Sequence, residues 1–218
     1  MLDPEIDDAV TGLAAQWAVA ERRIKQAEFV VGNRVVTAAI SELRYAGRKL
    51  IDANQLIVGG QWRNDPKEKA RLLAFLADAT EDCVKSKHDA IDSMMFFVSD
   101  WFGRTEEKAG LAELQKYFPD YIQLTGMISG IQDKIADSRG DRIGSRDGIY
   151  DAIEIDDYTK IIDLYRRMRE AEPRVQALAA RERVRGHILL WGTILGVALG
   201  IAALAVGIPA LWYAVHPP

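Results

Sequence analysis

The chain contains almost no cysteine or histidine. Its 218 residues include one cysteine, Cys83, and three histidines. A single cysteine excludes an internal disulfide framework and agrees with a reducing compartment. The first residues, MLDPEIDD, are acidic and lack the short apolar core of a secretory signal peptide. We therefore expect any membrane insertion to depend on a later segment.

Several catalytic signatures are also missing. The sequence has no P-loop, no glycine-flanked nucleophile and no Glu-x-x-His pair of the kind that holds two metal ions in a helical bundle. We therefore expect no catalytic residue, no metal and no cofactor. The minor alternative is an enzyme that uses His88 with nearby carboxylates, because Asp92 follows it by one helical turn and Glu81, Asp82 and Asp89 are close in the sequence.

Acidic and basic residues are unevenly spread along the chain, whose formal net charge is −4. Residues 166–185 include seven arginines and three glutamates, a local balance of +4, which leaves about −8 for the rest. A basic cluster beside a membrane favours anionic headgroups, but an ordinary positive flank without lipid specificity is the simpler interpretation. Because the remainder is acidic, we expect no nucleic-acid binding.

Charge is absent from the last long stretch, which covers residues 188–215 and reads ILLWGTILGVALGIAALAVGIPALWYAV. About 20 apolar residues suffice to cross a bilayer as a helix, so these 28 predict one transmembrane helix. Only residues 216–218 follow it, a layout that predicts a tail anchor. The alternative, a buried helix of a soluble protein, would need a core wider than this chain can build.

The flanks of this run predict its orientation. Positive charge precedes the run and none follows it, so the N-terminal bulk is expected in the cytoplasm. Aromatic rings near both ends suit the two headgroup zones of a bilayer. The predicted interface anchors are Arg181, Arg183, Arg185, Trp191, Trp212 and Tyr213.

Glycines recur every four residues inside the run, at Gly192, Gly196 and Gly200. This spacing places them on one helix face, where small residues let two backbones pack closely in lipid. The pattern predicts self-association of the spans. Glycine is also frequent in membrane helices generally, so the alternative is that these glycines have no role in association.

Apolar residues before the run recur in steps of three and four, the period of helices with coiled-coil-like seams. The spacing predicts one long helix from about Pro4 to Asn54, with Gly32–Asn33 as the candidate bend. Asp65 followed by Pro66 is a helix start signal, and this second helix is expected to end near Gly103.

Further seams follow in the second half of the chain. We predict a short helix capped by Thr105, another seam from Tyr121 to Ile135, and a last helix from about Ile153 toward the membrane, with Pro173 as a kink or boundary. No segment alternates apolar and polar residues for long, so no sheet is expected.

These patterns predict an all-α protein, an elongated antiparallel helical bundle of about four main helices followed by one C-terminal transmembrane helix. The predicted parts are a cytoplasmic helical bundle over residues 1–165, a basic juxtamembrane stem over 166–187, the transmembrane helix over 188–215 and a short tail over 216–218.

Residues 138–148 form the one predicted non-helical connection. Arg139, Arg142 and Arg146 alternate there with three glycines, a composition that suits an anion-binding loop. Asp141 and Asp147 partly cancel the positive charge. A flexible, solvated connector is the simpler interpretation.

Together these features predict a non-enzymatic, tail-anchored membrane protein whose cytoplasmic bundle mediates protein–protein interaction or self-assembly. The expected partners are the lipid bilayer, a second copy of the chain and an unidentified cytoplasmic protein. The alternative is a membrane effector of the cell-suicide or antiphage type, which oligomerises through its transmembrane helix and permeabilises the membrane.

Overall fold

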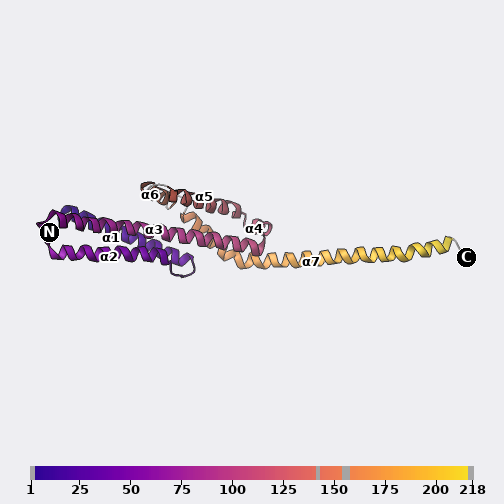
Figure 1. The fold of residues 1–218 in the computed structure, drawn as a ribbon. Helices are drawn as coiled ribbons and strands as arrows, with labels where there is room; N and C mark the ends of the chain where they lie inside the picture. The colour runs from indigo at the N-terminus through magenta and orange to yellow at the C-terminus, as the bar shows by residue number, and fades with distance from the viewer. Residues whose placement is uncertain (1–2, 141–142, 154–157, 216–218) are drawn as a thin grey trace. The chain divides into compact units, whose positions relative to one another are not determined.

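The computed structural model describes residues 3–140, 143–153 and 158–215 (Figure 1). It also describes their side chains, except those of residues 139, 140, 143–145, 200 and 202–215. Most of these residues are helical and none of them is in a strand, so the predicted all-α class is confirmed. The helices are α1 (Pro4–Val30), α2 (Thr37–Gly59), α3 (Pro66–Ala109), α4 (Leu111–Tyr117), α5 (Tyr121–Gly140), α6 (Ile143–Ala152) and α7 (Thr159–Val215), with a short 3₁₀ helix η1 (Gln61–Arg63) before α3.

The helices form two compact units. The first comprises residues 1–104 and 120–167, and the second comprises residues 105–119 and 168–218. Helices α3 and α7 each contribute to both units.

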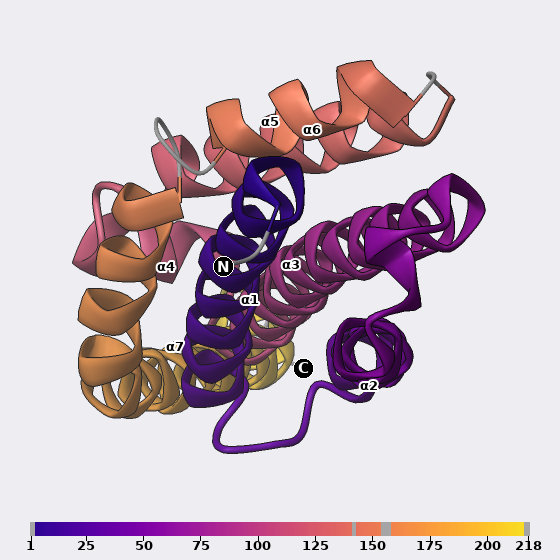
Figure 2. The same cartoon turned by 90° about the vertical axis from the view of Figure 1, so that its left-hand side faces the viewer.

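The prediction of one helix over residues 4–54 is wrong, because α1 ends at Val30 and α2 begins at Thr37. Gly32 and Asn33 take positive φ values of 79° and 60°, a conformation that helices cannot continue through. The chain reverses there, and α1 and α2 lie side by side with α3 (Figures 1 and 2). Five described helices therefore have 20 or more residues, rather than the predicted four.

A seam with seven-residue spacing holds α1, α2 and α3 together. Buried side chains on α1 recur every seven residues, and three alanines on α2 do the same with no exposed surface. Small side chains at such positions let helix axes approach closely. The main members are Ile6, Leu13 and Ala20 from α1, Ala46 and Ala53 from α2, and Leu72, Leu76, Ala79 and Cys83 from α3.

The predicted start of the second long helix is confirmed. Pro66 is the first residue of α3, and the Asp65 carboxylate accepts a hydrogen bond from the Lys67 backbone N–H at 2.9 Å. The predicted end near Gly103 is wrong, because α3 continues to Ala109. A single helical glycine costs about 1 kcal/mol, which burial of the neighbouring Thr105 and Phe102 outweighs. The helix ends instead before Gly110, whose φ is 87°.

Helix α5 buries the seam that the sequence predicts, from Tyr121 to Ile135. The predicted connector over residues 138–148 is mostly helical, because α5 extends to Gly140 and α6 begins at Ile143. Ser138 is fully buried, and its hydroxyl donates to the Ile135 carbonyl at 2.7 Å. Satisfying a polar side chain inside the helix in this way removes the cost of burying it.

Helix α7 continues through Pro173, which is therefore not a helix boundary. In the second unit, Met168, Val175 and Ala179 are its buried residues, and Leu114 of α4 is buried as well. Lys116 of α4 pairs with Glu182 of α7 at 3.4 Å.

We expect burial to decide how much a valine contributes to stability. Val98 on α3 is fully buried, whereas Val58 on α2 is 79% exposed. Val98→Ala should lower the free energy of unfolding by about 2 kcal/mol. The identical change at Val58 should stay within about 0.5 kcal/mol. Urea unfolding followed by circular dichroism measures both, and equal effects would contradict the packing described for α3.

Candidate functional site

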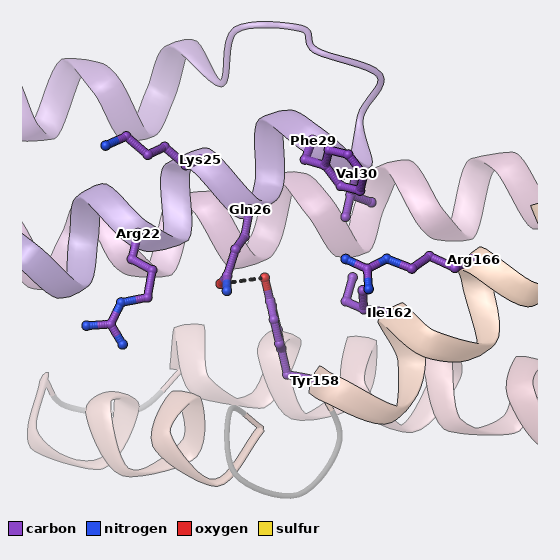
Figure 3. A pocket seen from close by; sticks show the side chains of 8 residues that line it. All are labelled: Arg22, Lys25, Gln26, Phe29, Val30, Tyr158, Ile162 and Arg166. Carbon is purple, nitrogen blue, oxygen red and sulfur yellow. Dashed lines mark hydrogen bonds between the residues drawn. The ribbon is translucent and has the colours of Figure 1, made fainter.

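A pocket of about 340 Å³ opens between the end of α1 and the beginning of α7 in the first unit (Figure 3). We call it the α1–α7 pocket. This volume lies at the lower end of the range of about 300–1,000 Å³ found for small-molecule sites. Its lining residues are Arg22, Lys25, Gln26, Phe29 and Val30 from α1, and Tyr158, Ile162 and Arg166 from the α7 side.

Hydrogen bonds tie the two sides of the α1–α7 pocket together. The Gln26 Oε1 atom accepts from the Tyr158 hydroxyl at 3.2 Å (Figure 3). The same oxygen accepts from Arg23 Nη1 at 2.6 Å. The Tyr165 hydroxyl also donates to the carbonyl of the lining residue Val30, at 3.3 Å. The Gln26 oxygen is thus committed twice, which leaves its amide N–H groups as the free donors of that side chain.

Three cationic side chains line the α1–α7 pocket, and no acidic side chain is among the lining residues that the structure describes. Arg22 makes no ion pair with a described residue, and the Arg166 guanidinium lies over the Phe29 ring, 5.5 Å from its centroid. Lys25 has only a long contact with Glu21, at 3.7 Å between exposed groups. Such surface pairs are weak, so the pocket keeps a positive field.

Burial raises the pKa of Tyr158, while the nearby Arg23 and Arg166 guanidinium groups oppose this shift. The Arg23 guanidinium lies over the Tyr158 ring at 4.8 Å. The Tyr158 hydroxyl therefore stays protonated at neutral pH and donates its hydrogen bond to Gln26 Oε1.

A second polar cluster surrounds His88, where α3 meets α6. The His88 ring stacks on Tyr150, with 3.9 Å between ring centroids, and its Nε2 atom lies 3.3 Å from a carboxylate oxygen of Asp147. The Tyr150 hydroxyl donates to Asp92 at 2.5 Å, and the Lys87 ammonium donates to Asp151 at 2.8 Å. A pocket of about 320 Å³ adjoins this cluster.

His88 is buried and neutral. Desolvation lowers its pKa to about 3, and the positive charges of Lys87 and Arg146 act in the same direction. A general base works best with a pKa near the operating pH, so a base this weak is poorly suited to that role. Desolvation likewise raises the pKa of the buried Cys83 thiol to about 11, which keeps it protonated and unreactive.

No group of three or more His, Cys, Asp or Glu side chains in the described part of the chain is arranged to hold a metal ion. The carboxylates near His88 in the sequence have other partners. Lys49 pairs with Asp82 at 2.9 Å, and Lys85 pairs with Glu81 at 2.8 Å.

The structure brings together residues that the sequence treats as separate features. Arg146, from the predicted anion-binding loop, lies on α6 and lines the same pocket as His88. The side chains of Arg139 and Arg142 lie outside the described residues. Asp147 and Tyr150 complete the cluster around His88, and nothing in their sequence spacing indicates that they would contact α3.

The residues of the α1–α7 pocket were not singled out from the sequence. Arg22, Lys25 and Phe29 share one face of α1 at helical spacing, which is a signal that sequence alone offers. Their partner Tyr158 is 132 residues away from Gln26, so the pocket exists only in the folded chain.

In the predicted membrane-facing region, Arg181, Arg183 and Arg185 are exposed, and Arg183 donates to the Lys108 carbonyl. Trp191 is 67% exposed. A Cβ atom added at Gly192 or Gly196 would meet no other atom within 4 Å, so this helix face is open. The side chains of Trp212 and Tyr213, and the environment of Gly200, lie outside the described residues.

Within the described residues, no helix has an apolar stretch long enough to cross a membrane. Residues 200 and 202–215 of the uncharged run are beyond the described side chains.

No protein-family model, no curated protein and no solved structure matches the chain. The function is therefore inferred from the chain's own residues.

Because His88 is charged more readily in the unfolded chain than in the fold, acid should destabilise the protein. Its pKa rises from about 3 in the fold to about 6.5 on unfolding, so the free energy of unfolding falls as the pH drops through this window. Between pH 7 and pH 5, the free energy of unfolding of the unmodified chain should therefore fall by up to about 2 kcal/mol more than that of His88→Gln.

The control for this experiment is His187→Gln, which alters an exposed histidine of α7. It should keep the pH dependence of the unmodified protein in urea unfolding at the two pH values. If His88→Gln retained the same dependence, the buried neutral state of His88 would be refuted.

Proposed function

We propose that this chain is a tail-anchored membrane protein whose helical bundle binds another protein or a second copy of itself at the membrane. The observation that carries this proposal is the exposure of large apolar side chains along α7. Nine of them between Ile188 and Ile201 are 48% to 67% exposed. They are Ile188, Leu189, Leu190, Trp191, Ile194, Leu195, Val197, Leu199 and Ile201.

These apolar side chains surround the helix rather than forming one stripe. Residues 188 to 191 point in four directions, because successive residues of an α-helix turn by about 100°. A helix that is apolar all round has no polar face to show to water, and it needs either a protein core or lipid around it. Continuation of the uncharged sequence to residue 215 on the same helix supports lipid as that environment.

The N-terminal bulk is proposed to face the cytoplasm. Three exposed arginines, Arg181, Arg183 and Arg185, precede the run, and the positive-inside bias places such residues on the cytoplasmic side. They would also lie beside anionic headgroups of that leaflet.

The first unit offers a surface for a protein partner. Helix α2 carries three large apolar side chains that are more than half exposed, Tyr45, Ile51 and Val58. Val35, two residues before the helix, is exposed to a similar degree. Ile51 and Val58 are seven residues apart and share one face of α2, and exposed apolar side chains that share a face suit contact with a partner. A binding role without catalysis is proposed, since His88 is too weak a base and Cys83 is protonated.

Introducing charge into the run should release the protein from membranes. Two arginines near the middle of a transmembrane helix cost about 5–7 kcal/mol on insertion scales. Leu199→Arg with Ile201→Arg should therefore move the protein to the supernatant after carbonate extraction and centrifugation. The control, Val58→Arg on α2, should stay in the pellet. A wild-type chain found in the supernatant would refute the anchor.

The glycine face should control self-association. Gly196→Leu adds a bulky side chain to this face, whereas Ala198→Leu adds a similar one about 200° around the helix. We expect only the first change to reduce the oligomer mass measured by light scattering in detergent. Equal masses for both variants would exclude the glycine stripe as the interface.

The same variants separate a scaffold from an effector. If the chain permeabilises membranes, induced expression should collapse the membrane potential, and Gly196→Leu should restore it. If oligomers form while the potential stays unchanged, the effector alternative is excluded and the scaffold role stands.

A further inference from the structure

The described lining of the α1–α7 pocket is positively charged, although the chain as a whole carries a negative net charge. Its three cationic lining residues, Arg22, Lys25 and Arg166, stand in a chain whose formal net charge is −4. No described carboxylate pairs with Arg22 or Arg166, although acidic residues outnumber basic ones by 32 to 28. Concave sites lined by charge of one sign concentrate ligands of the opposite sign.

The floor of this pocket is apolar. Val30 and Ile162 are 3% and 8% exposed, and Phe29 stands at the rim with 58% of its surface exposed. A solvated cluster of arginines needs no such floor. The combination of an apolar floor with cationic rims suits a ligand that has both an apolar and an anionic part.

The positive groups are spread along the pocket. In Figure 3 the Arg166 guanidinium extends toward the hydrogen-bonded pair of Gln26 and Tyr158 from one side, and the ends of Arg22 and Lys25 lie on the other side of that pair. The free N–H groups of Gln26 lie between them. A ligand that satisfies all of these donors must carry more than one negative charge.

We propose that the α1–α7 pocket binds an organic phosphate. A phosphomonoester carries about −1.5 to −2 charges at pH 7 and accepts several hydrogen bonds, and guanidinium groups match its geometry. Its phosphate contacts Arg166 and the Gln26 amide, further negative charge lies toward Arg22 and Lys25, and its apolar part covers the floor. This site goes beyond the proposed membrane anchoring and lies wholly within the first unit.

Two sources could supply this chemistry, a soluble nucleotide and an anionic lipid. The test uses ATP for the first and soluble dihexanoyl phosphatidic acid for the second, with dihexanoyl phosphatidylcholine as the zwitterionic comparison. Each is titrated by calorimetry into the full chain in a neutral detergent below the lipid's micelle concentration. Because the full chain is soluble in detergent with or without a spanning helix, failure of the anchor proposal leaves this test intact.

The informative variant is Arg22→Gln with Arg166→Gln, which removes two charges from the pocket rim. The matched control is Arg44→Gln with Arg48→Gln, which removes the same charge from exposed positions of α2. We expect the first pair to raise the Kd for ATP or phosphatidic acid at least tenfold, and the control pair to change it less than twofold. An unchanged Tm in both variants confirms that they are folded.

The outcome also identifies the source. Binding of ATP alone assigns a nucleotide site, and binding of phosphatidic acid without phosphatidylcholine assigns a lipid headgroup site. Hydrogen exchange should slow in residues 22–30 and 158–166 on binding. The proposal is overturned if neither probe binds, if both double variants weaken binding equally, or if protection appears elsewhere in the chain.

Discussion

Close approach of α1, α2 and α3 is the constraint on which the first unit depends. Alanines at seven-residue spacing, Ala39, Ala46 and Ala53, have no exposed surface, so their helix sits against its neighbours with little side-chain volume between. Larger buried residues on α1 and α3 fill the remaining space. The last turns of α1, which pack in this unit before the reversal at Gly32 and Asn33, form one wall of the α1–α7 pocket.

Two buried hydroxyl groups in this protein are satisfied by a backbone carbonyl of a second helix. Tyr165 reaches the Val30 carbonyl across 135 residues of sequence, and Ser86 donates to the Ala39 carbonyl at 2.7 Å. Leaving such groups unpaired would cost about 1–3 kcal/mol each. Because their geometry is directional, these bonds fix the relative position of helices that apolar contacts alone would allow to slide. The positions of Tyr158 and Gln26 follow from the same arrangement.

Helix α7 combines two kinds of surface along one element. Ile162 and Arg166 from its first turns line the α1–α7 pocket together with Tyr158, the residue before the helix, and there apolar and cationic groups are mixed. Its later part carries no charge between Arg185 and Val215, and the described apolar side chains from Ile188 to Ile201 are exposed on every side. The two parts differ because the first is covered by protein on one face, while the described apolar side chains of the second are exposed around the helix.

The sequence by itself determined the helical class, the start of α3 at Pro66, the seam from Tyr121 to Ile135 and the uncharged run, because periodicity, caps and charge are local properties. Only the tertiary structure decided the reversal after Val30, the continuation of α3 past Gly103, and the meeting of His88 with Arg146. It also created the α1–α7 pocket. These features depend on contacts between residues far apart in the chain. The free energy gained by burying those residues outweighs the local helix propensities, and a single stretch of sequence does not reveal it.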